Sequence, residues 1–396
     1  MILMKYFYIL FIITLVLFCP LNKGMAMEKE VLLKFENGDV IYRIEDTVVI
    51  DFLDKRDVLS SSLFNGGWRN DLQAVLNHHP AKEQETMTVE GYFANMNRLC
   101  KKLGYDAGKV STMGTGVPMK NVAIKQAAYE GIRVTAVVTA GAEGNPGRVG
   151  DKAVYNAIAK EKMPRPGTIN IMLYFNCDML PGTLVRALVT ATEAKTAALQ
   201  ELLLGSRYSS GLATGTGTDQ ILAISDPQAK LMITDCGKHT KPGELLGQVV
   251  KSAVKEALYK QNGFDGKKMH DVIRRMERFG MSRNRLMEDY RTNYDEKLSD
   301  KNFEQVLYNL NLNSEILTLT SLYAHLLDQY DWGLLSQQEI DSGGSLLLKK
   351  MAGDLRFKQL EKNEKIMPFV RNWEQVYLAL LDEEVKRCLK SMEFLY

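Results

Sequence analysis

Two kinds of hydrophobic pattern divide this chain of 396 residues. From residue 28 to residue 262, strand-like apolar runs, glycine-containing loops and helix-like stretches follow one another. From Lys267 onward, apolar residues recur at helical spacing without strand-like runs. Repeated strand, loop and helix is typical of layered α/β proteins, whereas an unbroken helical period indicates an all-α unit. The sequence therefore predicts an α/β domain, with a mixed sheet and covering helices, over residues 28–262, followed by an all-α accessory domain over residues 267–396.

The predicted strands are short apolar runs bounded by turn residues. Asn37-Gly38 between two such runs is a strong signal for a β-hairpin. Residues 132–140 form an almost continuous run of Val, Thr, Ala and Ile, which indicates a strand buried on both faces. The predicted strands are residues 31–35, 40–44, 48–53, 132–140, 168–175, 220–225 and 231–234.

Helices are expected where apolar residues recur every three or four positions and capping residues mark the ends. Gly104 and Gly131 are placed to end two of them, and Pro118 suits a first helical position. In the α/β domain the predicted helices are residues 71–76, 89–103, 118–130, 183–204 and 243–260. In the accessory domain they are residues 269–279, 300–310, 316–330, 344–355 and 372–395.

The first 26 residues form a hydrophobic leader. Lys5 precedes an apolar stretch, and Gly24-Met25-Ala26 places small residues where a signal peptidase would cut. Residues 2–21 would also suit a tilted membrane anchor, which would give the chain a membrane contact. A third interpretation is a misassigned start, with translation beginning at Met25 or Met27. These three explanations of residues 1–26 stay open.

Charge and metal-ligand residues narrow the range of functions. The chain has 50 basic and 48 acidic residues, a net charge of +2, so we expect no general attraction to nucleic acid. The five cysteines are far apart without a C-x-x-C pair, and the five histidines form no H-x-H or H-E-x-x-H pattern. The sequence therefore predicts neither a disulfide framework nor a protein-bound metal.

Polar, glycine-containing segments lie at the ends of the predicted strands or next to helices, where sites are usually built. The most unusual is residues 214–219, with the sequence Thr-Gly-Thr-Gly-Thr-Asp. Its glycines let the backbone approach a ligand, while its hydroxyls and amides offer neutral hydrogen-bond donors. It lacks the Gly-Lys-Ser/Thr ending of a phosphate-binding P-loop and precedes a strand rather than a helix.

Seven polar segments, of which four contain glycine, follow one another between about residues 30 and 260. They are Asn65-Gly66-Gly67, Asn77-His78, Thr139-Ala140-Gly141 with Asn145 and Gly150-Asp151, Thr168-Ile169-Asn170, residues 190–195, residues 214–219 and Gly237-Lys238-His239-Thr240. In this order they resemble the adenosylcobinamide amidohydrolase family, CbiZ. The leader and the helical region lie outside the resemblance.

The resemblance implies hydrolysis of the amide that joins a propionate side chain of the corrin ring to aminopropanol. The product would be adenosylcobyric acid, which re-enters cobamide synthesis in salvage and remodelling. The ligand would be a small-molecule corrinoid that carries its own cobalt, so no cofactor is expected. The hydrolase domain would be cytoplasmic, with export or membrane anchoring through the leader as the alternative.

Hydrolysis of an unactivated amide needs an activated water or nucleophile, donors for the oxyanion and an acid for the leaving amine. Within the shared segments, we expect a histidine or carboxylate to activate water and glycine-turn amides to hold the oxyanion. The candidate catalytic residues are His78, Asp151, Glu193, Asp219 and His239. The candidate substrate-binding residues are Asn65, Gly66, Gly67, Asn77, Gly141, Asn145, Asn170, Thr192, Lys195, Gly215, Thr216, Gly217, Thr218 and Lys238.

Each candidate also has a structural interpretation. Asp151 could cap a helix, Asp219 could close an Asx turn, and the histidines could be a cap or a solvated loop residue. Glu193 and Lys195 stand two positions apart on a predicted helix, so they should point to different sides. We therefore do not expect them to form an acid–base pair.

The nucleophile and the class of function stay open. A thiol at Cys177 or a hydroxyl at Thr139 or Thr216 could attack the amide, although no histidine stands near Cys177 in the sequence. The chain could instead be a non-catalytic corrinoid-binding salvage protein held at a membrane. If it is the hydrolase, deletion of the helical domain should leave hydrolysis intact.

Overall fold

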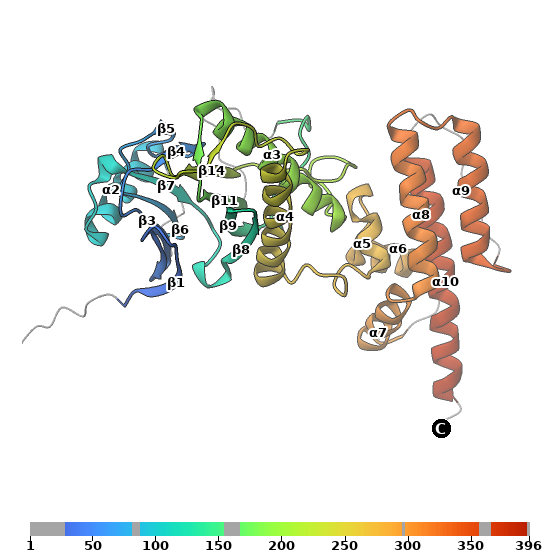
Figure 1. Ribbon diagram of the computed structural model, residues 1–396. Helices are drawn as coiled ribbons and strands as arrows, with labels where there is room; N and C mark the ends of the chain where they lie inside the picture. The colour runs from blue at the N-terminus through green and yellow to red at the C-terminus, as the bar shows by residue number, and fades with distance from the viewer. Residues whose placement is uncertain (1–27, 81–87, 154–166, 295–297, 356–365, 394–396) are drawn as a thin grey trace, which may run out of the picture.

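The computed structural model describes residues 28–80, 88–153, 167–294, 298–355 and 366–393. Figure 1 shows a domain with sheets and helices, followed along the chain by a group of helices. Within the described ranges, no helix is both long and apolar enough to cross a membrane. The leader at residues 1–26 lies outside the described residues.

The first sheet has five strands in the order β1-β2-β3-β6-β7. Its strands are β1 (Glu30–Lys34), β2 (Val40–Ile44), β3 (Thr47–Asp51), β6 (Ala74–His78) and β7 (Val110–Gly114). Neighbours are antiparallel except β6 and β7, which are parallel. The hairpin predicted at Asn37-Gly38 is confirmed, and Gly38 adopts a φ of 91° that favours glycine.

The second sheet has six strands in the order β5-β4-β14-β11-β9-β8. They are β4 (Asp57–Ser60), β5 (Gly67–Arg69), β8 (Ala123–Tyr129), β9 (Ile132–Gly141), β11 (Thr168–Phe175) and β14 (Gln220–Ser225). Only β11 and β14 are parallel neighbours. Two short pairs add β10 (Pro146–Gly147) with β13 (Gly215–Thr216), and β12 (Asp178–Met179) with β15 (Met232–Ile233).

The two sheets face each other, and helices cover their outer faces (Figure 1). Ile50 and Val75 of the first sheet share a core with Met172 and Leu222 of the second. Helix α2 (Val89–Leu103) packs on the first sheet, while α3 (Pro181–Glu201) and α4 (Lys241–Asn262) pack on the second. The predicted mixed α/β class is confirmed. The single predicted sheet is in fact two, because periodicity identifies strands but not their partners.

Two predicted helices were wrong. Residues 74–76, the second half of this segment, belong to β6, whose apolar residues are buried between β3 and β7. Residues 118–130 form the short η2 (Met119–Asn121) and then β8, which pairs with β9 along its length. Glu130 and Gly131 both have positive φ, 44° and 86°, so they build a two-residue hairpin instead of a helix end. Strand pairing and burial override the helix propensity of the Ala, Lys and Gln residues in β8.

The other predicted strands and helices of the α/β domain are confirmed, with ends that differ by a few residues. Strands β4, β5 and β7 were not predicted; each is short and carries Ser, Gly or charged residues. A 3-10 turn, η1 (Ala107–Lys109), links α2 to β7.

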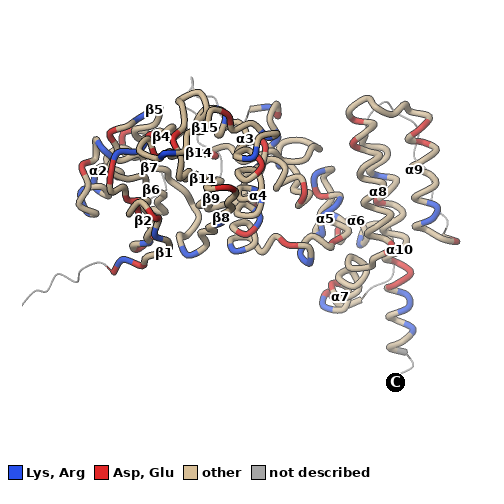
Figure 2. The backbone as a smooth tube through the Cα atoms, viewed as in Figure 1, with Lys and Arg blue, Asp and Glu red and all other residues tan. Residues whose placement is uncertain are grey.

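The C-terminal region is helical throughout its described residues and has its own core around Leu327, Ile340 and Trp373. Its helices are α5 (Val272–Met276), η3 (Glu277–Phe279), α6 (Arg283–Asn293), α7 (Asp300–Asn311), α8 (Ser314–Asp331), α9 (Gln337–Ala352) and α10 (Met367–Glu393). Helix α6 was not predicted. Figure 2 shows basic and acidic residues interspersed over the described part of both domains.

Candidate active site

A buried line of polar side chains joins the two sheets. Asn77 on β6 donates from Nδ2 to Thr139 Oγ1 on β9 at 2.8 Å, and its Oδ1 accepts from Asn170 Nδ2 on β11 at 2.8 Å. Asn170 Nδ2 also donates to the carbonyl of Gly114 at 3.0 Å. All three side chains are fully buried. The side-chain amides of Asn77 and Asn170 therefore connect the two sheets. They fix the position of β9 and β11 relative to β6.

The turn at residues 214–219, hereafter the 214–219 turn, leads into β14 and is organised around the Asp219 carboxylate. Oδ1 of Asp219 accepts from the Ile169 amide at 2.9 Å and from the Thr216 hydroxyl at 2.5 Å. Oδ2 accepts from the Thr216 amide at 3.0 Å and from Lys195 Nζ. Because a carboxylate offers about four acceptor positions, these donors occupy all of them.

Lys195 reaches Asp219 from the buried face of α3, and the side chains of both residues are 9% exposed. Gly215 lies directly against this ion pair. A Cβ at position 215 would overlap the Asp219 carboxylate and lie 2.7 Å from Lys195 Nζ. The glycine is therefore required here for the close approach of backbone to a buried charge pair.

The carbonyl of Gly167, just before β11, accepts hydrogen bonds from side chains of two loops. It accepts from Thr216 Oγ1 at 3.0 Å, Thr218 Oγ1 at 2.9 Å and Asn145 Nδ2 at 3.1 Å. The Thr216 hydroxyl has one proton, so it donates either to Gly167 or to Asp219. Asn145 Oδ1 is buried without a hydrogen-bond partner among the described residues. Gly141 ends β9 beside this point, where it pairs with Thr168.

Asp151 connects two loops that lie next to the 214–219 turn. Its carboxylate accepts from the Arg148 amide at 2.8 Å and from Ser206 Oγ at 2.6 Å. Partial burial acts to raise the pKa of Asp151, but hydrogen bonds from Ser206 and Ser209 outweigh it and lower the pKa. A carboxylate held ionised by such donors is well suited to fix loop geometry.

His78 lies on the opposite face of β6 from Asn77, because successive strand residues point to opposite sides. Its Nδ1 is 2.8 Å from Thr47 Oγ1 on β3. Its neighbours on that face, Ala74 and Leu76, belong to the core beneath α2. The structure thus separates His78 from the Asp219 carboxylate.

Burial lowers the pKa of His78 below its ordinary value of 6.5. The folded state therefore favours the neutral imidazole of His78. The stability that this neutral form contributes is fully present above pH 6.5 and is lost as the pH falls below 6.5. We expect His78→Gln to flatten the fall in unfolding free energy between about pH 6.5 and 5 by at most about 1.4 kcal/mol per pH unit. Urea unfolding across this range measures it. His239→Gln, at an exposed site, should keep the wild-type slope, and a parallel slope for both variants would contradict the prediction.

Four other predicted residues lie on an exposed surface over the outer side of α3. Thr192, Glu193, Lys238 and His239 are all exposed. Glu193 pairs with Lys238 Nζ at 2.8 Å, whereas Lys195 points into the domain. The prediction that Glu193 and Lys195 face different sides is confirmed. The structure does not bring this exposed group together with Asp219.

The Asn65-Gly66-Gly67 segment shapes the connection from β4 to β5. Asn65 has a φ of 52°, and its Nδ2 donates to the carbonyls of Ala107 and Val110, each at 2.7 Å. A Cβ at Gly66 would overlap a backbone carbonyl, and Gly67 has a φ of 87°. These hydrogen bonds lead to the start of β7 and not to the 214–219 turn.

The environment of Cys177 works against a thiol nucleophile at this position. Burial raises the pKa of Cys177 to about 12, which disfavours the thiolate that a nucleophile needs. Among the described residues, no group of three or more His, Cys, Asp or Glu side chains is placed to hold a metal. The expectation that the protein works without a resident metal stays a prediction.

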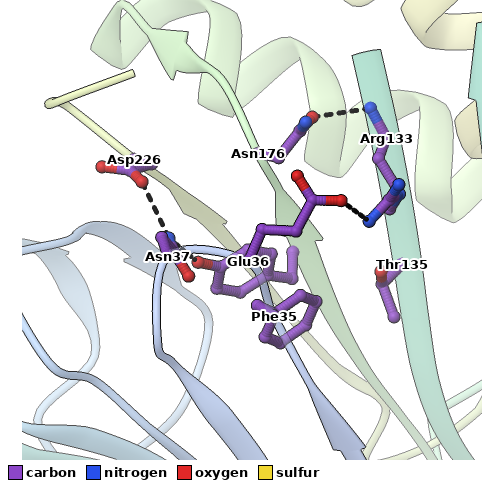
Figure 3. A pocket seen from close by; sticks show the side chains of 8 residues that line it. Phe35, Glu36, Asn37, Arg133, Thr135, Asn176 and Asp226 are labelled. Atoms are coloured by element: carbon purple, nitrogen blue, oxygen red, sulfur yellow. Dashed lines mark hydrogen bonds and ion pairs between the residues drawn. The ribbon is translucent and has the colours of Figure 1, made fainter. Parts of the chain in front are cut away.

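A small cavity of about 150 Å³ opens at the other end of β11 from Asn170. Figure 3 shows Glu36 and Asn176 directed toward Arg133, and Asn37 toward Asp226. Pockets that enclose ligands of drug size usually measure about 300–1,000 Å³. The cavity is therefore too small for a corrin ring.

Sequence reasoning missed several residues that build the site. Thr168 Oγ1 donates to the carbonyl of Thr218 at 2.7 Å, and Thr196 Oγ1 on α3 donates to that of Thr214 at 3.1 Å. Thr168 stands in a shared segment and could have been chosen on that ground. Ser206 lies outside every shared segment, and only folding brings it to Asp151. Gly217, at the tip of the turn, is exposed.

The fold and these contacts define an α/β protein with a carboxylate-centred polar site next to a glycine-rich turn. The family model for adenosylcobinamide amidohydrolase, CbiZ, matches residues 32–266. The chain belongs to this family. The match contains every predicted site residue and ends before the helical domain.

Individual relatives add little about the reaction. An uncharacterized protein of Methanocaldococcus jannaschii is 34% identical over 229 residues, which cover 54% of this chain and 87% of the relative. A crystal structure of a protein from Pyrococcus horikoshii OT3 covers 60% of this chain and 81% of its own, with 12% identity and a TM-score of 0.27. At that TM-score the likeness supports no argument about fold or function.

Proposed function

We propose that this protein hydrolyses the aminopropanol amide of adenosylcobinamide to give adenosylcobyric acid, and that Thr216 is its nucleophile. The family match supports a corrinoid amidohydrolase. The observation that carries the assignment of Thr216 is its 2.5 Å contact with an Asp219 carboxylate whose other acceptor positions are filled.

The four donors bound to the Asp219 carboxylate limit which proton this carboxylate can remove. Two of its donors are backbone amides and one is the Lys195 ammonium, so the Thr216 hydroxyl is the remaining donor. A water would have to displace Thr216 before Asp219 could activate it. The sequence led us to expect that a histidine or carboxylate activates water; we propose instead that the Thr216 hydroxyl attacks the amide. Thr216 is partly exposed, whereas Lys195 is buried.

The steps balance as two acyl transfers. Thr216 Oγ bonds to the amide carbon while its proton moves to Asp219, and the Lys195 ammonium stabilises the negative charge that develops. The carbon–nitrogen bond then breaks, and the proton on Asp219 passes to the amine of aminopropanol. Water then attacks the carbon of the Thr216 ester and gives a proton to Asp219. The bond from Thr216 Oγ to this carbon breaks, Asp219 returns the proton to Thr216 Oγ, and the corrin carboxylic acid is released.

The test is a product assay on purified protein with adenosylcobinamide, in which mass spectrometry measures aminopropanol and adenosylcobyric acid. We expect Thr216→Val to lose about a thousandfold or more in kcat and Thr216→Ser to retain measurable turnover. Thr218→Val is the matched control, because its hydroxyl binds the same Gly167 carbonyl without touching Asp219. It should lose less than about tenfold.

Three outcomes would contradict the proposal in different ways. Corrinoid binding without product in the wild type would favour the non-catalytic binding protein. Full activity of Thr216→Val would remove Thr216 as the nucleophile while leaving the reaction. A mature N-terminus cleaved after residue 26, measured by mass spectrometry, would argue against the cytoplasmic location that we propose for the hydrolase domain.

A further inference from the structure

The helical domain touches the α/β domain at the loop of residues 205–211, hereafter the 205–211 loop. Arg278 of η3 pairs through Nη1 and Nη2 with Asp328 of α8, with Nη2 at 2.7 Å from Oδ2, and Nη1 also donates to the Ser210 carbonyl. The Arg278 and Asp328 side chains are 8% and 9% exposed. Ser210 Oγ donates to Asp331 Oδ2 at 2.9 Å. Arg278 of η3 therefore binds the carbonyl of Ser210, while Asp331 at the end of α8 binds its hydroxyl.

A second contact reaches the loop of residues 146–151, hereafter the 146–151 loop. The Arg148 guanidinium lies over the indole ring of Trp332, 5.6 Å from its centroid. A guanidinium within about 6 Å of an aromatic centroid is attracted to the face of the ring. The helical domain thus contacts both loops, through residues that immediately follow each other at the end of α8.

The two loops pack tightly on each other. A Cβ at Gly211 would lie 2.6 Å from Arg148 Cδ. The Arg207 amide donates to the Pro146 carbonyl at 2.9 Å. With the Asp151–Ser206 hydrogen bond, these contacts leave little room for one loop to move without the other.

The 146–151 loop in turn fixes the 214–219 turn. The Thr214 amide donates to the Gly147 carbonyl at 2.8 Å, and Thr214 Oγ1 accepts from the Val149 amide at 2.9 Å. Strand β10 pairs with β13, which places Pro146 opposite Thr216. A continuous set of contacts therefore runs from Asp331 and Trp332 to the proposed nucleophile.

We infer that the helical domain is a positioning element for the site: Arg278, Asp328, Asp331 and Trp332 hold the 205–211 and 146–151 loops and thereby the 214–219 turn. The domain lies beyond the family match, so this dependence is an addition in this chain. It replaces the expectation that deletion of the helical domain leaves hydrolysis intact. The expected effect of the helical domain on hydrolysis rests on the proposed function. The expected effect on the order of the 214–219 turn does not.

The test uses the full chain with Asp331→Ala/Trp332→Ala, because both side chains are exposed and their loss should leave the helical core folded. Hydrogen–deuterium exchange of peptides from residues 146–152 and 205–219 should become about tenfold faster. Asp328→Asn, which weakens the Arg278 pair, should give the same pattern. If the wild type hydrolyses adenosylcobinamide, kcat should fall by about tenfold in both variants, with little change in KM.

Two control variants sit in the same domain away from the loops. Leu346→Ala removes an apolar side chain that is 69% exposed on α9, and Glu374→Gln disrupts a pair with Arg285 Nε at 2.8 Å. Exchange in residues 205–219 should stay at the wild-type rate in both. The inference would be overturned if Asp331→Ala/Trp332→Ala and Asp328→Asn exchanged at the wild-type rate. It would also be overturned if exchange were accelerated equally in the two control variants. If the wild-type protein does not hydrolyse adenosylcobinamide, the proposed function is rejected. The hydrogen–deuterium exchange result then still tests whether the helical domain positions the turn.

Discussion

Lys195→Met is expected to reduce kcat/KM by about a hundredfold or more and to lower the unfolding free energy by about 3–5 kcal/mol. The reason is that the substitution removes the cationic partner of the Asp219 carboxylate in a site where both side chains are 9% exposed, and no described cation replaces Lys195. Breaking one half of a buried pair costs more than the pair contributes, because the remaining charge is left uncompensated. Urea unfolding and the product assay measure the two effects.

The control for Lys195→Met is Lys251→Met. Lys251 Nζ pairs with Glu201 at 2.7 Å, but both side chains are 41% exposed, so the loss should be less than about 1 kcal/mol. The double variant Lys195→Met/Asp219→Asn removes both charges and should regain about 2 kcal/mol without regaining activity. Equal stability of Lys195→Met and Lys251→Met would show that the buried pair is not as isolated from water as the structure indicates.

Gly215→Ala is expected to lower both the stability and the activity of the protein. Its Cβ would meet the Asp219 carboxylate and Lys195 Nζ together, and neither can move away without breaking the hydrogen bonds of the 214–219 turn. Overpacking of this kind costs about 1–3 kcal/mol. We expect kcat/KM to fall by about a hundredfold, since a shift of about 1 Å misaligns the Thr216 hydroxyl.

Gly247→Ala is the matched control for Gly215→Ala. Gly247 lies within α4, where a Cβ would meet no atom within 4 Å, so the substitution should raise stability by about 0.5–1 kcal/mol. Activity should stay at the wild-type level. If Gly215→Ala is as active as Gly247→Ala, the turn is not as closely packed on the charge pair as the distances require.

Much of the fold could be predicted because the local signals agree with the tertiary environment. The run at residues 132–140 predicts a strand buried on both faces, and β9 indeed packs one face on α4 and the other, through Val137, on the first sheet. Residues 71–76 and 118–130 were misassigned because their local sequence favours helix, while pairing with β3, β7 and β9 favours strand. Local propensity amounts to tenths of a kcal/mol per residue, and burial in a sheet exceeds it.

The candidate site could be predicted only in part. Asn77, Asn145, Asn170, Thr216, Thr218 and Asp219 stand in shared segments, and the structure brings their hydrogen bonds to the ends of β6, β9 and β11. His78 and Glu193 stand in the same segments, yet one faces α2 and the other faces solvent. A motif specifies residue types at given spacings, whereas the side of a strand or helix that meets the site depends on what packs against it.

By itself, the sequence determined the class of the fold, the α/β region followed by a helical region, and the family. These follow from hydrophobic period and from segment order, which are properties of the chain alone. Tertiary structure decided the rest: two facing sheets instead of one, Lys195 rather than Glu193 beside Asp219, and a helical domain bound to the loops of the site. Such contacts join residues tens to more than a hundred positions apart, and only the packing of the folded chain selects them.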